Sequence, residues 1–309
     1  MTEKISVLIV TRNRSEMLVS CINSLAAQTQ IPDEVIVVDN ASTDNTKEII
    51  LSFKKELPIQ YIREDQVGIP YARNRGIGVV HGSLILMLDD DCQADKFWIE
   101  RMVDAHKKYK KAWVVQGRTF SLPKTRPYSL LVEFKRSISL RNYTKKKLPL
   151  IMKGFFQSYF KDEKEILTCD TKNLSIKTSY FKKYKLSFDE HFYRGSDADL
   201  GRQIVEKNGL IMFCPSVTVA HWERSTLAEF LEQRWHIGRT KARMLSKWKT
   251  PTMVNMDLLA TLLAFFHFCK IFNQWRNSPI VMVLLLLDRL YYFNGYFFEK
   301  RFLKLGKAL

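Results

Sequence analysis

The feature that most constrains the fold is a regular alternation of short apolar runs with helical segments over the first 90 residues. Runs rich in β-branched and aliphatic residues predict strands at 5–10, 34–38, 59–62 and 84–88. Between them, apolar residues at helical spacing predict helices near 17–25, 46–53 and 69–80. Strands that alternate with helices of this length form parallel βαβ units, so we expect an α/β fold whose sheet is covered on both faces.

Acidic residues follow two of these predicted strands. Asp39 comes directly after the second run, and Asp89, Asp90 and Asp91 follow the fourth. In an open parallel sheet, ligands bind outside the carboxyl ends of the strands. The two acidic clusters are therefore expected to face one crevice.

Three consecutive aspartates after a buried strand predict a divalent cation. Like charges a few ångströms apart raise one another's pKa, and a bound cation relieves that repulsion. Mg²⁺ is commonly held by one or two carboxylates together with substrate phosphates, so the triplet suits Mn²⁺ or Mg²⁺ beside a phosphorylated ligand. The alternative is a capped helix start with surplus negative charge, since residues from 94 onward could be helical.

Four motifs occur in an order that is specific only when they are taken together. They are Ile5-Ser-Val-Leu-Ile-Val-Thr-Arg-Asn, Glu34-Val-Ile-Val-Val-Asp-Asn-Ala-Ser-Thr-Asp-Asn-Thr, Gly68-Ile-Pro-Tyr-Ala-Arg-Asn-Arg-Gly and Ile85-Leu-Met-Leu-Asp-Asp-Asp. Over about residues 4–240 the chain resembles the family 2 inverting glycosyltransferases. The resemblance implies a GT-A fold, which has a Rossmann-like, mostly parallel sheet flanked by helices.

The resemblance also implies a metal site within the aspartate triplet. Asp91 and Asp89 match the DXD pair, with Asp91 as the direct metal ligand and Asp89 nearer the ribose or the ion's water. Asp90 is expected to point away from the ion. His221 lies where some relatives supply a third metal ligand, although a lone histidine is more often structural.

Further residues match donor-binding and catalytic positions of the family. Thr11 begins the loop around the nucleoside, Asp39 matches the residue that contacts a uracil or thymine base, and Arg73 matches a residue near the nucleotide. Asp197 matches the catalytic base, with N-capping of the following helix as the alternative. Ser196 stands where relatives usually have a glutamate, which leaves the role of that position open.

The charge distribution argues against nucleic acid as a partner. The chain has a net charge of +17, but residues 1–100 hold 10 Lys and Arg against 15 Asp and Glu, so the later residues carry +22. No zinc-finger, RNP-type or basic-zipper pattern accompanies this charge. Five scattered cysteines fit neither a disulfide framework nor a zinc site.

The sequence predicts two domains. Residues 1–240 form the catalytic domain, with a donor half over about 1–115 and an acceptor half over about 116–240. Within the latter, residues 120–165 are expected to be mobile or to face the acceptor. Residues 196–208 are predicted to be helical, and residues 210–219 to form a strand that Pro215 breaks. Residues 241–309 form a helical, apolar and basic tail. Gln233-Arg-Trp imperfectly resembles a signature of processive relatives, and we interpret it as helix surface, with Arg234 a candidate diphosphate contact.

The tail contains two apolar blocks, at 253–272 and 279–298. Charged residues interrupt both, whereas a spanning helix needs about 20 mainly apolar residues. Attachment in the membrane interface is the first interpretation, and burial against protein or true spanning are the alternatives. The terminal lysines and arginine suit anionic lipid headgroups.

The resemblance to the glycosyltransferase family implies an enzyme of cell-surface polysaccharide biosynthesis. It would move a sugar from a UDP- or dTDP-sugar to a hydroxyl of a glycan or lipid-linked acceptor. The start of the chain has no basic, long apolar leader, so we expect a cytoplasmic protein, peripheral on the inner face of the cell membrane. The alternative is a catalytically weak scaffold that keeps the fold and binds a partner enzyme. The sequence does not indicate an oligomeric state.

Overall fold

The structure, a computed structural model, describes residues 3–122, 131–132, 134, 162–223, 226–249 and 278–304. Two compact units contain them. Unit 1 comprises Met1–Phe120, Tyr143–Lys145 and Lys161–Trp222, and unit 2 comprises Ser121–Asn142, Lys146–Phe160 and Glu223–Leu309. Most of the segment 120–165 and the first apolar block of the tail lie outside the described residues.

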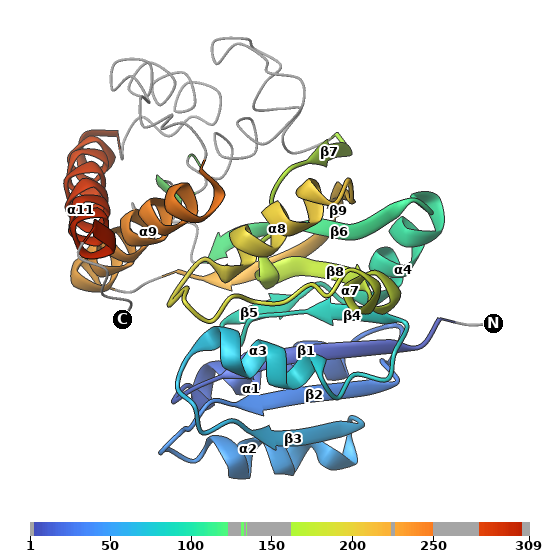
Figure 1. The fold of residues 1–309 in the computed structure, drawn as a ribbon. Coiled ribbons are helices and arrows are strands. Elements are labelled where there is room, and N and C mark those ends of the chain that lie inside the picture. The colour runs from blue at the N-terminus through green and yellow to red at the C-terminus, as the bar shows by residue number, and fades with distance from the viewer. Residues whose placement is uncertain are drawn as a thin grey trace. The chain divides into compact units, whose positions relative to one another are not determined.

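Unit 1 is built on a sheet whose first part is parallel (Figure 1). All four predicted strands are present and lie in the order β3-β2-β1-β4, with parallel pairing throughout. Nearly every side chain of β1, β2 and β4 is buried, as expected for strands covered on both faces. Their bounds are β1 (Ile5–Thr11), β2 (Glu34–Asp39), β3 (Ile59–Arg63) and β4 (Leu84–Met87).

Helices α1 (Ser15–Ala26), α2 (Thr46–Ser52) and α3 (Ile69–Ile77) connect these strands. α3 lies unusually close to the sheet at Gly76, where an added Cβ would be 2.3 Å from Leu8 Cδ1. The missing side chain allows this approach, which brings Arg73 of the same helix to the carboxyl end of the sheet. The three helices confirm the predicted βαβ units.

The second part of the sheet is antiparallel and was largely missed by the sequence prediction. β8 (Leu174–Lys177) pairs with β4, and β6 (Ala112–Leu122) pairs with β8. β9 (Leu210–Trp222) pairs with β5 (Cys92–Ala94) and with β7 (Lys164–Ile166). Because Met87 pairs with Leu174, the residues just before β8 lie beside the aspartates just after β4.

Two further expectations in this region are corrected. Residues 92–94 form β5, and helix α4 (Trp98–Lys108) begins only at residue 98, so the aspartate triplet does not cap a helix. β9 runs through Pro215, which was expected to break it. The proline lies between the stretches of β9 that pair with β7 and with β5.

Four further elements complete the described part of unit 1. They are the 3-10 turn η1 (Phe53–Lys55) after α2, the 3-10 turn η2 (Thr171–Asn173) before β8, helix α7 (Thr178–Lys183) and helix α8 (Ser196–Glu206). α8 agrees with the helix predicted over residues 196–208. Gly195, with φ of 80°, precedes it in the left-handed region that favours glycine.

Unit 2 contains a closely packed helix pair, α9 (Leu227–Trp248) and α11 (Ser278–Lys304). A Cβ on Gly238 would lie 2.0 Å from the carbonyl oxygen of Tyr292, and one on Gly295 would lie 2.0 Å from that of Trp235. Side chains at these positions would push the helices apart. The predicted domain boundary at residue 240 falls inside α9.

Ion pairs also join α9 to α11. Arg239 and Arg243 both donate to the buried Glu299, and Arg234 lies 3.7 Å from the buried Asp288. Arg234 is itself buried within unit 2, so its interpretation as helix surface was wrong. A buried charge is stable only when it is paired, which explains why arginines of one helix meet the acidic residues of the other.

Candidate active site

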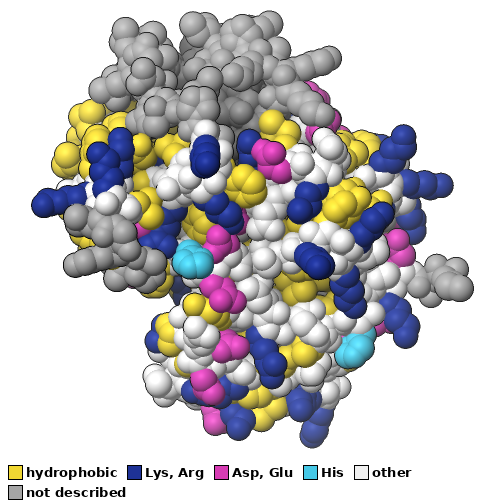
Figure 2. Space-filling view, in the orientation of Figure 1, with side chains coloured by type: hydrophobic (Ala, Val, Ile, Leu, Met, Phe, Trp, Pro, Cys, Tyr) yellow, Lys and Arg dark blue, Asp and Glu magenta, His cyan; other side chains and the backbone are white. Residues whose placement is uncertain are grey.

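The polar residues of unit 1 gather where the parallel strands end. Asp39 ends β2, the aspartate triplet follows β4, and the pairing of β9 with β5 brings His221 opposite Cys92. Figure 2 shows acidic side chains in a column on the side of unit 1 where β2 and β3 end. The structure therefore places the predicted acidic clusters at one edge of the sheet.

Asp39 is buried and held by its own surroundings. Its Oδ1 accepts a hydrogen bond from the backbone N–H of Ser42 at 2.9 Å. Its Oδ2 accepts from the Tyr61 hydroxyl at 2.9 Å and lies 3.4 Å from Nη1 of Arg63. The carboxylate is thus fixed at the strand end by three donors from β3 and the loop after β2.

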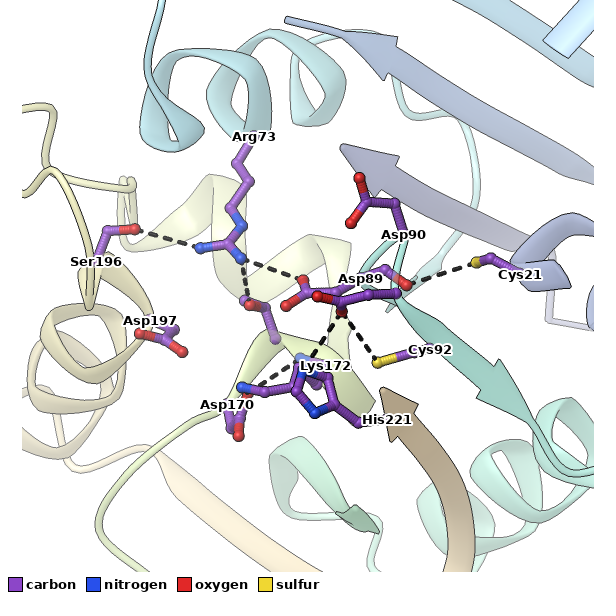
Figure 3. Close-up of polar contacts among 12 residues, drawn as sticks. Cys21, Arg73, Asp89, Asp90, Cys92, Asp170, Lys172, Ser196, Asp197 and His221 are labelled. Carbon is purple, nitrogen blue, oxygen red and sulfur yellow. Dashed lines mark hydrogen bonds and ion pairs between the residues drawn. The ribbon is translucent and has the colours of Figure 1, made fainter. Parts of the chain in front are cut away.

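Asp90 faces the loop after β1. Its Oδ2 accepts from the Thr11 hydroxyl at 2.8 Å and its Oδ1 from Nη1 of Arg14 at 2.9 Å. Burial raises its pKa to about 6, with Arg14 opposing the rise and Asp91 adding to it. Figure 3 shows its carboxylate directed away from that of Asp89.

Asp91 has a different set of partners. Its Oδ2 accepts from Arg14 Nη1 at 2.8 Å, while its Oδ1 lies 3.4 Å from Nε2 of His221. Both side chains of the Asp91–His221 pair are buried. The histidine predicted from sequence as a third ligand therefore lies next to the aspartate predicted as the first.

The donor set of this pair fits a divalent cation that substrate oxygens help to coordinate. Among the described residues, no group of three His, Cys, Asp or Glu side chains could hold a metal ion. Asp89 turns instead toward Arg73, whose Nη2 lies 3.3 Å from Asp89 Oδ1. Two protein ligands are enough for Mg²⁺ when phosphate oxygens and water complete the coordination.

Arg73 connects the end of β4 to two other elements of unit 1. Besides Asp89, its Nη2 donates to the Thr171 hydroxyl at 2.5 Å, and its Nη1 donates to the Ser196 hydroxyl at 3.3 Å. The guanidinium also lies over the Phe188 ring, 5.2 Å from its centroid. Ser196, where relatives usually have a glutamate, accordingly accepts a hydrogen bond from the arginine that also binds the triplet (Figure 3).

Asp197 lies in the first turn of α8, and Gly195 occupies the N-cap position. Burial raises the pKa of this carboxyl, the nearby Asp170 raises it further, and Arg73 and Lys172 oppose the rise. Asp170 in turn accepts hydrogen bonds from the backbone N–H of Lys172 at 3.1 Å and from its Nζ at 2.7 Å. Figure 3 shows the Asp197 and Asp170 side chains on one side of the site, opposite Cys21 and Cys92.

Sequence reasoning missed three charged residues of this site: Arg14, Asp170 and Lys172. Arg14 was visible in the polar Thr-Arg-Asn-Arg segment after the first strand, at the same sheet edge as the triplet. Asp170 and Lys172 had no comparable signal. They reach the site only through the antiparallel pairing of β8 with β4, which joins residues far apart in the sequence.

Comparison with known proteins identifies the family. The model of the family described as Glycosyl transferase family 2 matches residues 6–184, more than half of the chain. The chain belongs to glycosyltransferase family 2. The expectation drawn from its four motifs is confirmed.

Curated relatives match only part of their own length. A validoxylamine A glucosyltransferase of Streptomyces hygroscopicus subsp. limoneus is 32% identical over 138 residues, covering 42% of this chain and 30% of that protein. Glycosyltransferase AglE of Haloferax volcanii is 39% identical over 104 residues, covering 32% of this chain and 34% of AglE. The chain thus spans about a third of the length of these relatives.

Solved structures confirm the GT-A fold. S. aureus TarS 1–349 in complex with UDP-GlcNAc aligns with a TM-score of 0.57 at 18% identity, covering 98% of this chain and 92% of that one. GalNAc-T7 with UDP, GalNAc and Mn²⁺ aligns with a TM-score of 0.56 at 16% identity, covering 72% of this chain and 44% of that one. At such identities the likeness concerns the fold.

Proposed function

We propose that this family 2 glycosyltransferase moves a sugar, with inversion, from a UDP- or dTDP-sugar to a hydroxyl of a glycan or lipid-linked acceptor. The observation that carries the proposal is the bridge made by Arg73. It joins Asp89 of the DXD pair to the start of α8, where the partly buried Asp197 has a raised pKa. A candidate phosphate site and a candidate base therefore lie on either side of one arginine.

The donor would bind at the carboxyl ends of β1, β2 and β4. Asp39 and the loop that begins at Thr11 would hold the nucleoside, while Arg73 and Asp89 would lie near the ribose and diphosphate. Asp91 and His221 would hold Mn²⁺ or Mg²⁺, which would stabilise the charge that develops on the leaving diphosphate. Support comes from the 3.4 Å approach of Asp91 to His221 and from the nucleotide complexes of the TarS and GalNAc-T7 structures.

The transfer step would use Asp197 as the general base. Its carboxylate would accept the proton of the acceptor hydroxyl while that oxygen bonds to the anomeric carbon and the bond from sugar to diphosphate breaks. A base works best when its pKa lies near the working pH, and burial together with Asp170 raises the pKa of Asp197 in that direction. The configuration at the anomeric carbon would be inverted, because the acceptor oxygen displaces the diphosphate in a single step, as the family's inverting mechanism implies.

A thermal-shift panel of nucleotide sugars with and without Mn²⁺ tests donor binding. A bound ligand stabilises the fold by mass action, so the true donor should raise Tm, and Mn²⁺ should increase the shift. Asp91→Asn should lose the Mn²⁺-dependent part of the shift, whereas Asp104→Asn, on the exposed surface of α4, should retain it. If no nucleotide or nucleotide sugar changes Tm, the enzyme proposal fails and the scaffold alternative gains support.

We further propose that the enzyme attaches peripherally to an anionic membrane, in keeping with a cell-surface polysaccharide role, through α11 of unit 2. One side of this helix packs on α9, and the other exposes five large apolar side chains by 51–64%: Ile280, Val283, Leu286, Leu290 and Phe297. Lys300, Arg301 and Lys304 follow at its end. An apolar face with basic residues beside it suits anionic lipid.

Attachment in the interface is favoured over spanning by the charges between the two helices. Within the described residues, Pro279–Lys304 is the one helix long and apolar enough to cross a membrane. Its Asp288 and Glu299 are paired with arginines of α9, so an inserted α11 would draw α9 with it. The charged α9 would then enter hydrocarbon at a cost of about 2.5–3.5 kcal/mol per central arginine or lysine.

A further inference from the structure

Arg14 occupies a central place at the triplet, although the proposed donor and catalytic roles make no use of it. A single nitrogen, Nη1, lies 2.9 Å from Asp90 Oδ1 and 2.8 Å from Asp91 Oδ2. The two carboxylates are 7% and 6% exposed, and the arginine is 31% exposed. Burial by itself would lower the pKa of Arg14, but Asp90 and Asp91 raise it, so the guanidinium stays charged.

This contact selects which oxygen of Asp91 is presented to a ligand. Arg14 engages Oδ2, and Oδ1 is the oxygen that lies 3.4 Å from His221 Nε2. Asp91 Oδ1 also accepts a weak hydrogen bond from the Cys92 thiol at 3.8 Å, whereas the two oxygens of Asp90 accept from Arg14 and from the Thr11 hydroxyl. The same arginine therefore sets Asp91 for one-oxygen coordination beside His221 and turns Asp90 away.

The loop that carries Arg14 is also joined to the candidate nucleoside pocket. The backbone N–H of Asn13 donates to the Ser42 hydroxyl at 3.0 Å, and Asn13 Oδ1 accepts from the Thr43 N–H at 2.8 Å. The Ser42 N–H in turn donates to Asp39 at 2.9 Å. Hydrogen bonds thus join Asp39 to Ser42 and Ser42 to Asn13, and Asn13 is the chain neighbour of Arg14, which binds Asp91.

We propose that Arg14 is a positioning residue that orients Asp91 toward the metal and couples metal binding to nucleotide binding. The inference rests on the proposed function, because it presupposes a cation at Asp91 and His221. Partners that orient a ligand carboxylate typically contribute about 10- to 100-fold to metal affinity. Because coupling between two ligands is reciprocal, the loss should be visible in both metal and nucleotide binding.

Two titrations on the purified full chain test this role. Mn²⁺ binding is followed by the EPR signal of the free ion at saturating UDP, and UDP binding is followed by calorimetry with and without Mn²⁺. Arg14→Gln should weaken Mn²⁺ binding in the UDP complex by about 10- to 100-fold. It should also reduce the Mn²⁺-dependent gain in UDP affinity by the same factor, with a much smaller change in metal-free UDP binding.

Arg14→Lys and Arg101→Gln complete the design. Arg14→Lys keeps the charge and should recover part of the Mn²⁺ affinity. If Arg14→Gln does not fold, Arg14→Lys takes its place in both titrations. Arg101 is the matched control, because its Nη1 makes a 2.9 Å ion pair with Asp95 outside the metal site, and Arg101→Gln should leave both affinities unchanged.

The outcomes separate this inference from the proposed function. A wild-type chain that binds neither UDP nor dTDP contradicts the proposed function itself; if it binds only dTDP, both titrations use dTDP in place of UDP. A wild-type chain that binds UDP and Mn²⁺ together, while the Arg14 variants bind both with wild-type affinity, overturns the positioning role alone. A loss of stability in Arg14→Gln with unchanged Mn²⁺ affinity also overturns it, because it would show that Arg14 acts as a structural counter-ion.

Discussion

At the scale of single residues, the site depends on charges that burial brings close together. Asp170 is the clearest case, since no proposed step uses it directly, yet it lies close enough to raise the pKa of Asp197. Lys172 holds Asp170 through its Nζ and opposes that effect on Asp197. The base is thus tuned by neighbours that precede β8, an element the sequence did not predict.

Asp170→Asn should shift the pH profile of transfer. Asp197 must be ionised to act as base, so kcat falls as the pH drops through its pKa, which is raised in the folded enzyme. Removing the Asp170 charge lowers that pKa and should move the acid limb of kcat to lower pH. The measurement is kcat against pH for the wild type, Asp170→Asn and the surface variant Asp104→Asn. An unmoved acid limb in Asp170→Asn would contradict the assignment of Asp197 as the titrating base.

At the scale of elements, close packing places the functional side chains. α3 carries Arg73 to the sheet edge only because Gly76 lets it approach β1. Gly76→Ala should destabilise the fold by about 1–3 kcal/mol, the usual cost of overpacking, because its Cβ would lie 2.3 Å from Leu8 Cδ1. Gly78→Ala, at the end of the same helix, is the control: its nearest contacts are 3.4 and 3.5 Å. Urea denaturation measures both, and equal stability for the two variants would show that α3 does not depend on this approach.

The exposed face of α11 makes a second prediction at this scale. Leu286→Glu combined with Leu290→Glu should abolish flotation of the protein with vesicles that contain anionic phosphatidylglycerol, because both leucines lie on the exposed side. Ile31→Glu in unit 1, where Ile31 is 51% exposed, should float like the wild type. Two results would contradict attachment to anionic lipid. In one, the wild type floats with neutral vesicles and not with anionic ones; in the other, it floats with neither and self-associates in solution.

At the scale of the whole molecule, the sequence predicts what is local and misses what depends on distant pairing. β1, β2 and β4 are continuous apolar runs because both faces are buried, so their position and the acidic residues after β2 and β4 could be read directly. β5 and β7 have three residues each and β8 has four, which is too short for a periodic signal. Asp170 and Lys172 were missed because their place depends on one of these short strands.

The central claim is that the site at the carboxyl ends of the strands transfers a sugar with Asp197 as base. The most direct measurement is the rate of transfer to acceptor by Asp197→Asn and the wild type, with the donor that the thermal-shift panel identifies and with UDP affinity measured in parallel. We predict that Asp197→Asn retains wild-type UDP affinity and loses transfer by at least about 100-fold, within the range that general bases contribute. Transfer at the wild-type rate by Asp197→Asn would contradict the account.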